Sequence, residues 1–175
     1  RVVREVTIAA LVRGVEARGN AKTPGDVALL LAREKAMSVS RLTPKRLVLG
    51  ADQTLALGER RFSKPADRAA AREQLKVLAG KTHELHAAIA VVRDGDVLFA
   101  HADAARLTIR AFTDGFLERY LDTAGEAATM SVGGYQLEGA GIHLFERVEG
   151  DYFTILGLPL LPLLNFLRRE KIVAE

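Results

Sequence analysis

The chain has 175 residues, of which 49% are hydrophobic and 27% charged, a composition typical of one globular α/β domain. A chain of this length buries roughly two-thirds of its surface on folding, so it needs no disulfide, and it contains no cysteine. Its 25 basic and 22 acidic residues are interspersed, which does not favour a nucleic-acid-binding surface. No apolar run reaches the roughly 18 residues of a membrane span. These features predict a cytoplasmic protein that binds neither nucleic acid nor membrane.

The first half of the chain predicts helices separated by a strand and a hairpin. Thr23 is a suitable N-cap, Pro24 suits the first helical position, and Asp26 favours the positive end of the helix dipole. Gly80 suits the left-handed position after a helix. The predicted elements are helices at 3–15, 24–38 and 67–78, a buried strand at 46–51, and a hairpin over 54–62 that turns at Gly58 and Glu59.

The second half alternates apolar strands with amphipathic helices. Strands are predicted at 82–92, 97–100, 105–112 and 142–148, and helices at 113–121 and 160–169. We find no repeat, low-complexity tract or long linker, so residues 1–175 are predicted to form a single domain. The alternation favours a mixed α/β sheet flanked by helices over an all-parallel sheet.

Three polar residues stand where the pattern expects apolar side chains or tight loops. Lys35 lies beside the apolar stripe of its helix, Asp52 ends the predicted buried strand, and Lys64 precedes Pro65. Two lysines and a carboxylate that converge at a strand edge suggest a polyphosphate ligand, with the acid acting on water or a metal. Each residue also has a structural interpretation, since Lys35 can extend its charged end to water and Asp52 can serve as a turn residue.

A second group of polar residues lies in a glycine-rich segment at 131–142. Its four glycines surround Tyr135, Gln136 and Glu138, and they would allow a ligand to approach the backbone closely. The spacing matches neither a Walker loop nor a dinucleotide fingerprint, so a simple turn between strands stays open as the alternative. The four histidines show no metal-ligand spacing, because His83 and His86 would face opposite sides of a strand.

The candidate residues belong to short sequence blocks. In chain order the blocks are Lys35-Ala36, Gly50-Ala51-Asp52-Gln53, Ser63-Lys64-Pro65, Leu78-Ala79-Gly80-Lys81-Thr82-His83, Gly134-Tyr135-Gln136-Leu137-Glu138-Gly139, Gly150-Asp151-Tyr152 and Gly157-Leu158-Pro159-Leu160. This ordered set resembles the Maf family of nucleotide pyrophosphatases, which hydrolyse nucleoside triphosphates to monophosphate and pyrophosphate. The resemblance covers residues 24–170.

The resemblance implies a role for each matching position. Asp52 would be the proton acceptor for the attacking water, and Lys35 and Lys64 would contact phosphates. A divalent cation, Mg²⁺ or Mn²⁺, would stabilise charge on the triphosphate, although no metal ligand is assigned in the chain. The fold implied is an elongated Maf and inosine-triphosphatase-like α/β domain, expected to form a homodimer.

Two positions in the family are associated with the base of the nucleotide, and here they hold Gln53 and Glu138. This pair is similar to the branch that acts on 7-methyl-GTP, whereas the branch for dTTP and UTP carries Thr and Gln. A carboxylate can accept from N1–H and the exocyclic amine of guanine, and it favours the positive charge that 7-methylation adds. The resemblance therefore implies a 7-methyl-GTP pyrophosphatase.

At its start the chain departs from the family pattern. Family members begin with a strand and a Ser- and Arg-containing loop that grips phosphates, and this loop is not found upstream of the first predicted helix. This departure leaves open a non-catalytic nucleotide-binding regulator of cell division. A second alternative is the same reaction on dTTP, UTP or a broad set of nucleotides.

Overall fold

A computed structural model describes residues 21–174 of the chain. The described residues form two compact units, each assembled from segments that are separate in the sequence. Unit 1 comprises residues 21–53, 86–103 and 157–174, and unit 2 comprises residues 54–85 and 104–156. The helix predicted at 3–15 lies outside the described residues.

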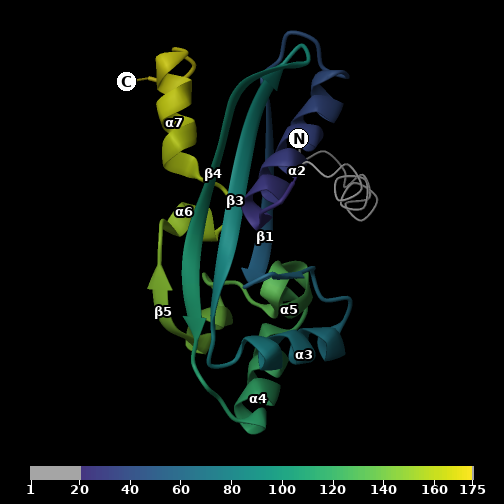
Figure 1. Cartoon of the computed structure of the whole chain (residues 1–175), viewed down its shortest axis with the longest axis vertical. Coiled ribbons are helices and arrows are strands. Elements are labelled where there is room, and N and C mark those ends of the chain that lie inside the picture. Colours follow the sequence, from purple (N-terminus) through teal and green to yellow (C-terminus); the bar gives the residue numbers. More distant parts are fainter. Residues whose placement is uncertain (1–20, 175) are drawn as a thin grey trace. The chain divides into compact units, whose positions relative to one another are not determined.

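The elements alternate between helices and strands, which confirms the predicted α/β class (Figure 1). The five strands follow the order β2-β1-β3-β4-β5, and β1 pairs antiparallel with β2 as β4 does with β5. In chain order the elements are α2 (Pro24–Ser40), β1 (Val48–Leu57), β2 (Arg60–Phe62), α3 (Arg68–Leu78), β3 (Thr82–Arg93), β4 (Asp96–Ile109), α4 (Asp114–Ala124), α5 (Ala127–Met130), two 3₁₀ turns (Val132–Gly134 and Ala140–Leu144), β5 (Phe145–Glu149), α6 (Tyr152–Ile155) and α7 (Leu160–Arg169).

Helix α2 begins as its sequence predicts. The Thr23 hydroxyl accepts from the Asp26 backbone N–H at 3.1 Å, and the Asp26 carboxylate accepts from the Thr23 N–H at 3.0 Å. This reciprocal capping box satisfies two donors that the first turn cannot pair internally. Pro24 follows in the first turn, where a missing N–H costs nothing. Local sequence thus fixes where the helix starts, and it runs to Ser40.

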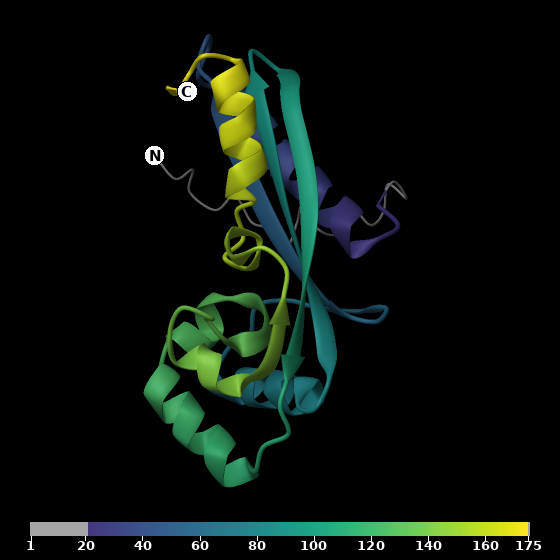
Figure 2. The same ribbon diagram turned by 90° about the vertical axis from the view of Figure 1, so that its left-hand side faces the viewer.

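In unit 1 two helices cover opposite faces of the strands. Side chains of β3 alternate, so that Ala88, Ala90 and Val92 pack with α2, while Ile89 and Val91 pack with α7. Figures 1 and 2 show α2 and α7 on the two sides of β3 and β4. Both faces of this strand are therefore buried, which explains its nearly unbroken apolar sequence.

Unit 2 has its own core, in which helices α3, α4 and α5 cover the remaining strand segments. Leu55, Leu75, Leu107 and Leu117 are fully buried there. At its surface, the Glu118 carboxylate of α4 accepts from Arg72 at 2.5 Å and from Arg68 at 2.9 Å, both on α3. The hydrogen bond from Arg72 lowers the pKa of Glu118, and the same bond raises the pKa of Arg72.

In the second half of the chain, two strand predictions differ from the structure. The strands predicted at 97–100 and 105–112 form one continuous strand, β4, which ends at Ile109. The residues between the two predicted strands, 101–104, are His-Ala-Asp-Ala and mostly exposed, so the apolar pattern is interrupted while the strand continues. The strand predicted at 142–148 begins only at Phe145, because a 3₁₀ turn occupies Ala140–Leu144. None of the helices in residues 21–174 is long and apolar enough to cross a membrane.

Gly150 and Asp151 shape the connection from β5 to α6. Gly150 has a φ of +126°, and a side-chain Cβ at this position would lie 2.7 Å from the Cβ of Ala105. Asp151 caps α6, since its carboxylate accepts from the Thr154 N–H at 2.9 Å. In unit 2 these two residues therefore build a tight turn and a helix start.

We expect Gly150→Ala to lower the free energy of unfolding by about 2 to 4 kcal/mol, because a left-handed φ and overpacking against Ala105 act together. Gly80→Ala is the matched control: φ is also positive there, but nothing lies within 4 Å of the added methyl group. It should cost about 1 kcal/mol. Urea unfolding of both variants measures the difference, and equal losses would contradict the close contact with Ala105.

Candidate functional site

Strand β1 and helix α2 approach each other closely at Gly50. A Cβ on Gly50 would overlap the carbonyl oxygen of Ala32 and lie 2.8 Å from the backbone nitrogen of Ala36. Gly50 is buried, and Ala32 and Ala36 have no exposed surface. Only a residue without a side chain fits here, so this contact fixes the register of α2 along β1.

The same contact brings Lys35 of α2 to Asp52 of β1. Because side chains alternate along a strand, Asp52 faces the same side as Gly50. The Lys35 ammonium donates to Asp52 Oδ1 at 2.6 Å and to the Ala51 carbonyl oxygen at 3.2 Å. The side chain of Asp52 is 9% exposed and that of Lys35 is 34% exposed. This part-buried ion pair joins two of the residues that the sequence singled out.

The position of Asp52 within its strand differs from the prediction. The sequence suggested that the strand ends at Ala51 and presents Asp52 at its edge, but β1 continues to Leu57. The reason is that Leu55 and Ala56 are buried in unit 2, so the strand continues into a second core after its polar residues. Asp52 therefore lies in mid-strand, where backbone pairing on a long strand holds it more firmly than a loop would.

Gln53 faces the opposite side of β1 from Asp52. Ala51, two residues earlier on the same face, packs with the apolar cluster of α7. A Cβ on Gly157 would be 3.8 Å from Cδ, Oε1 and Nε2 of Gln53 alike. Such equal distances mean that Gly157 faces the plane of the amide. The Gly157 segment of the sequence motif thus lies against a residue predicted to contact the base.

Lys64 lies between β2 and α3 in unit 2. Its side chain is exposed, whereas that of Pro65 is buried. The carbonyl oxygen of Ser63 accepts from the Gln74 side chain at 2.9 Å, which ties the segment to α3. The backbone at Lys64 is therefore held on both sides while its ammonium faces solvent.

Glu138 lies on a short closed loop of unit 2. The Gly139 N–H donates to the Gln136 carbonyl oxygen at 3.2 Å. Gly141 closes the loop, because any Cβ there would overlap that same carbonyl oxygen. Leu137 is 8% exposed and anchors the loop in the core, whereas Glu138 is exposed. The loop thus presents the carboxylate to solvent on a constrained backbone.

The buried rings of His83, Tyr120 and Tyr135 support the glycine-rich segment that precedes this loop. His83 Nε2 and the Tyr135 hydroxyl are 2.6 Å apart, and the Tyr120 hydroxyl donates to the Gly134 carbonyl oxygen at 2.9 Å. His83 is 1% exposed, and among the described residues its Nδ1 has no hydrogen-bond partner. Burial lowers the pKa of His83 to about 4, raises that of Tyr120 to about 12, and raises that of Tyr135 further. All three side chains are therefore neutral at physiological pH.

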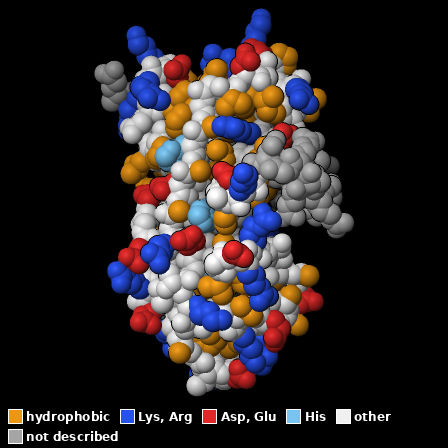
Figure 3. Space-filling model, viewed as in Figure 1, with side chains coloured by type: hydrophobic (Ala, Val, Ile, Leu, Met, Phe, Trp, Pro, Cys, Tyr) orange, Lys and Arg blue, Asp and Glu red, His pale blue; other side chains and the backbone are white. Residues whose placement is uncertain are grey.

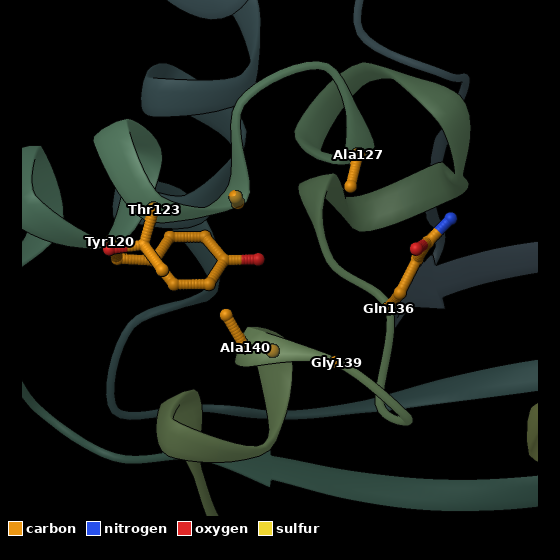
Figure 4. A pocket seen from close by; sticks show the side chains of 8 residues that line it. Tyr120, Thr123, Ala127, Gln136, Gly139 and Ala140 are labelled. Atoms are coloured by element: carbon orange, nitrogen blue, oxygen red, sulfur yellow. The ribbon is translucent and has the colours of Figure 1, made fainter.

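A pocket of about 150 Å³ opens beside the loop (Figure 4). Tyr120, Thr123 and Ala127 line one part of it, and Gln136, Gly139 and Ala140 line the other. Glu138 is not among the residues that line it. The pocket shows that the loop does not fill the space between itself and helices α4 and α5.

The surface view agrees with the charge pattern of the sequence. On the face shown in Figure 3, Lys and Arg side chains are interspersed with Asp and Glu. Within residues 21–174, no group of three or more His, Asp or Glu side chains could hold a metal ion between them. The described residues therefore do not form a metal site in which protein side chains supply three or more ligands.

The structure thus brings together part of the predicted site. Lys35, Asp52 and Gln53 belong to unit 1, and Lys64 and Glu138 belong to unit 2. Sequence reasoning missed the packing role of Gly50, although a glycine inside an apolar strand is a known sign of close backbone approach. It also gave no role to His83, whose partner Tyr135 lies 52 residues away.

Comparison with known proteins gives consistent matches. The sequence matches the family described as Maf-like protein over residues 3–170. It is 58% identical over 162 residues to a nucleoside triphosphate pyrophosphatase of Rhodopseudomonas palustris strain BisB18, and 59% identical over 162 residues to one of Bradyrhizobium diazoefficiens. Each match covers 93% of this chain and 80% of the relative. A 7-methyl-GTP pyrophosphatase of Brucella abortus biovar 1 is 53% identical over 151 residues, which is 86% of this chain and 76% of the relative.

We expect the stability of the protein to fall as pH drops from about 6.5 to 4, with His83 contributing up to about 3 kcal/mol. The folded pKa is depressed, so between these two pH values the unfolded state takes up a proton that the folded state does not. His83→Asn should flatten this part of the curve of unfolding free energy against pH. His143→Asn, at an exposed position, is the control and should follow the parent. Parallel curves for His83→Asn and the parent would contradict the assignment.

Proposed function

This chain belongs to the family of Maf-like proteins, and we propose that it is a hydrolase that converts a nucleoside triphosphate to the monophosphate and pyrophosphate. The observation that carries the proposal is the Lys35–Asp52 pair, a carboxylate held at 2.6 Å from an ammonium in mid-strand. The family match over residues 3–170 and relatives named nucleoside triphosphate pyrophosphatase support the same reaction.

The reaction needs a water molecule, a base and neutralising charge. In the proposed mechanism Asp52 accepts a proton from water as the water oxygen attacks the α-phosphorus. The bond from that phosphorus to the oxygen bridging to the β-phosphate breaks, and pyrophosphate leaves with the bonding electrons. Lys64 would contact the phosphates as a point charge, and Lys35 would supply its positive charge beside Asp52.

A divalent cation, Mg²⁺ or Mn²⁺, is part of the proposal as a companion of the substrate. The described residues form no cluster of three acidic or histidine ligands, but Mg²⁺ is commonly held by substrate phosphates with only one or two carboxylates. When bound, the cation would stabilise negative charge on the phosphate oxygens. Homodimer formation and a cytoplasmic location stay predictions.

We further propose 7-methyl-GTP, or a related modified purine nucleotide, as the substrate. Glu138 is exposed on a constrained loop, and its carboxylate can accept from the N1–H and the exocyclic amine of guanine. Its negative charge also favours the cationic 7-methylated ring. Gln53 would make a second contact to the base. The Brucella relatives named 7-methyl-GTP pyrophosphatase support this substrate, while the Rhodopseudomonas relatives support the broader class.

We expect the protein, assayed with Mg²⁺ on a panel of nucleotides, to release pyrophosphate from at least one of them. Asp52→Asn should lower kcat by roughly 10²- to 10⁴-fold, the usual contribution of a general base. Asp122→Asn removes an exposed carboxylate that pairs with Arg68 and should retain the parent activity. Full activity of Asp52→Asn would refute its role as the base. Nucleotide binding without turnover in the parent would favour a non-catalytic regulator instead.

We expect Glu138→Gln to lower the preference for 7-methyl-GTP over UTP roughly tenfold to hundredfold, because the amide has no charge and replaces one acceptor oxygen by an NH₂ donor. The measurement is the ratio of kcat/KM for the two nucleotides. Glu146→Gln, an exposed glutamate on β5, is the control and should keep the parent ratio. An unchanged ratio in Glu138→Gln would contradict base recognition by this residue.

A further inference from the structure

We propose that Lys35 is a positioning residue that acts on the reaction through Asp52, in place of the direct phosphate contact that the family resemblance implies for it. This inference rests on the proposed function, because it assigns the step in which Lys35 takes part. Three observations carry it: the partners of the ammonium, the burial of the carboxylate, and the fixed position of helix α2.

The first observation is that the Lys35 ammonium is already bound to β1. An ammonium has three N–H donors. Two of them are used on neighbouring residues of one strand, Asp52 Oδ1 at 2.6 Å and the Ala51 carbonyl oxygen at 3.2 Å. A phosphate contact by the same two donors would require both bonds to break, and it would leave the Asp52 carboxylate without this partner.

The second observation is the burial of Asp52. Its side chain is 9% exposed, so water can do little to stabilise a negative charge there. The ammonium at 2.6 Å supplies that stabilisation and also fixes the direction of the carboxylate. A base must be both charged and aimed at its water molecule, and displacement by about 1 Å can cost roughly 10²-fold in rate. Lys35 meets both needs.

The third observation is that α2 cannot shift along β1. Gly50 fits between Ala32 and Ala36, and this contact allows no space for a side chain. Lys35 lies within this contacting turn, directly before Ala36, so the contact holds its backbone beside the strand. Lys35 thus reaches Asp52 from a helix whose position on the strand is fixed.

Lys64 provides the contrast. Its side chain is exposed, and within residues 21–174 no ion pair of its ammonium is found. An exposed lysine on a held backbone is suited to meet phosphates that arrive from solvent. The two lysines therefore differ in role, although the family resemblance implies a phosphate contact for both.

The test compares Lys35→Met with Lys64→Met in kcat, KM and the inhibition constant for pyrophosphate with Mg²⁺. We expect Lys35→Met to lower kcat roughly 100-fold while the inhibition constant changes less than twofold. Lys64→Met should instead weaken pyrophosphate binding roughly tenfold. Lys76→Met is the matched control, because Lys76 also pairs with an aspartate, Asp114, and its side chain is likewise 34% exposed. It should leave all three quantities unchanged.

Two further variants separate positioning from a merely structural effect. Lys35→Arg keeps a positive charge within reach of Asp52. Its kcat should therefore be at least tenfold higher than that of Lys35→Met. Calorimetry of pyrophosphate with Mg²⁺ on Asp52→Asn and on Asp52→Asn/Lys35→Met compares two proteins in which residue 52 carries no charge. Equal affinities are expected.

A weaker affinity of the double variant, by tenfold or more, would show that Lys35 holds phosphate and would overturn the positioning role. The same conclusion would follow if Lys35→Met raised the inhibition constant as much as Lys64→Met with kcat retained. Both results leave the proposed pyrophosphatase reaction intact. The reaction itself fails only if the parent releases no pyrophosphate from any nucleotide.

Discussion

The close approach of α2 to β1 at Gly50 is the constraint on which the candidate site depends. Because no side chain fits between the strand and the turn formed by Ala32 to Ala36, the helix has one register on the strand. That register brings an ammonium on α2 to a carboxylate on β1 at 2.6 Å. The packing of small apolar residues thus sets the position of the helix, and this position pairs two charges. Without a partner, each charge would be costly to bury there.

Strand β1 also places two consecutive candidate residues, Asp52 and Gln53, on opposite sides. Asp52 faces α2 with its lysine partner, and Gln53 faces the other side, against Gly157 and the segment that leads to α7. Alternation along a strand makes this separation unavoidable for neighbouring residues. Under the proposed function, proton transfer by Asp52 and the base contact of Gln53 therefore lie on opposite sides of β1.

Unit 2 presents the candidate residue Glu138 in a different way. Glu138 is exposed, but the loop that carries it closes through the contact of Gly141 with Gln136 and is anchored by Leu137. Below it, His83 and Tyr135 form a buried hydrogen bond between groups that burial keeps neutral. The charged group is left in solvent and the buried polar groups carry no charge, which avoids the cost of burying ions.

The sequence by itself determined the local features of this protein. The capping residue Thr23, the hairpin turn at Gly58 and Glu59, and the helix at Leu160–Arg169 follow from short-range preferences, and the structure confirms them. The order of motif blocks also identified the family and selected Lys35 and Asp52. These features are readable because each depends on residues close together in the chain, or on motif blocks compared as a set.

Only the tertiary structure decided how far strands extend and which polar residues meet. Strand β1 passes Asp52 because Leu55 and Ala56 enter a second core, and β4 continues through exposed residues because backbone pairing does not require buried apolar side chains. The pairing of Lys35 with Asp52 and of His83 with Tyr135 spans 17 and 52 residues. Such contacts depend on which elements pack together, and packing is a property of the whole fold that no local pattern contains.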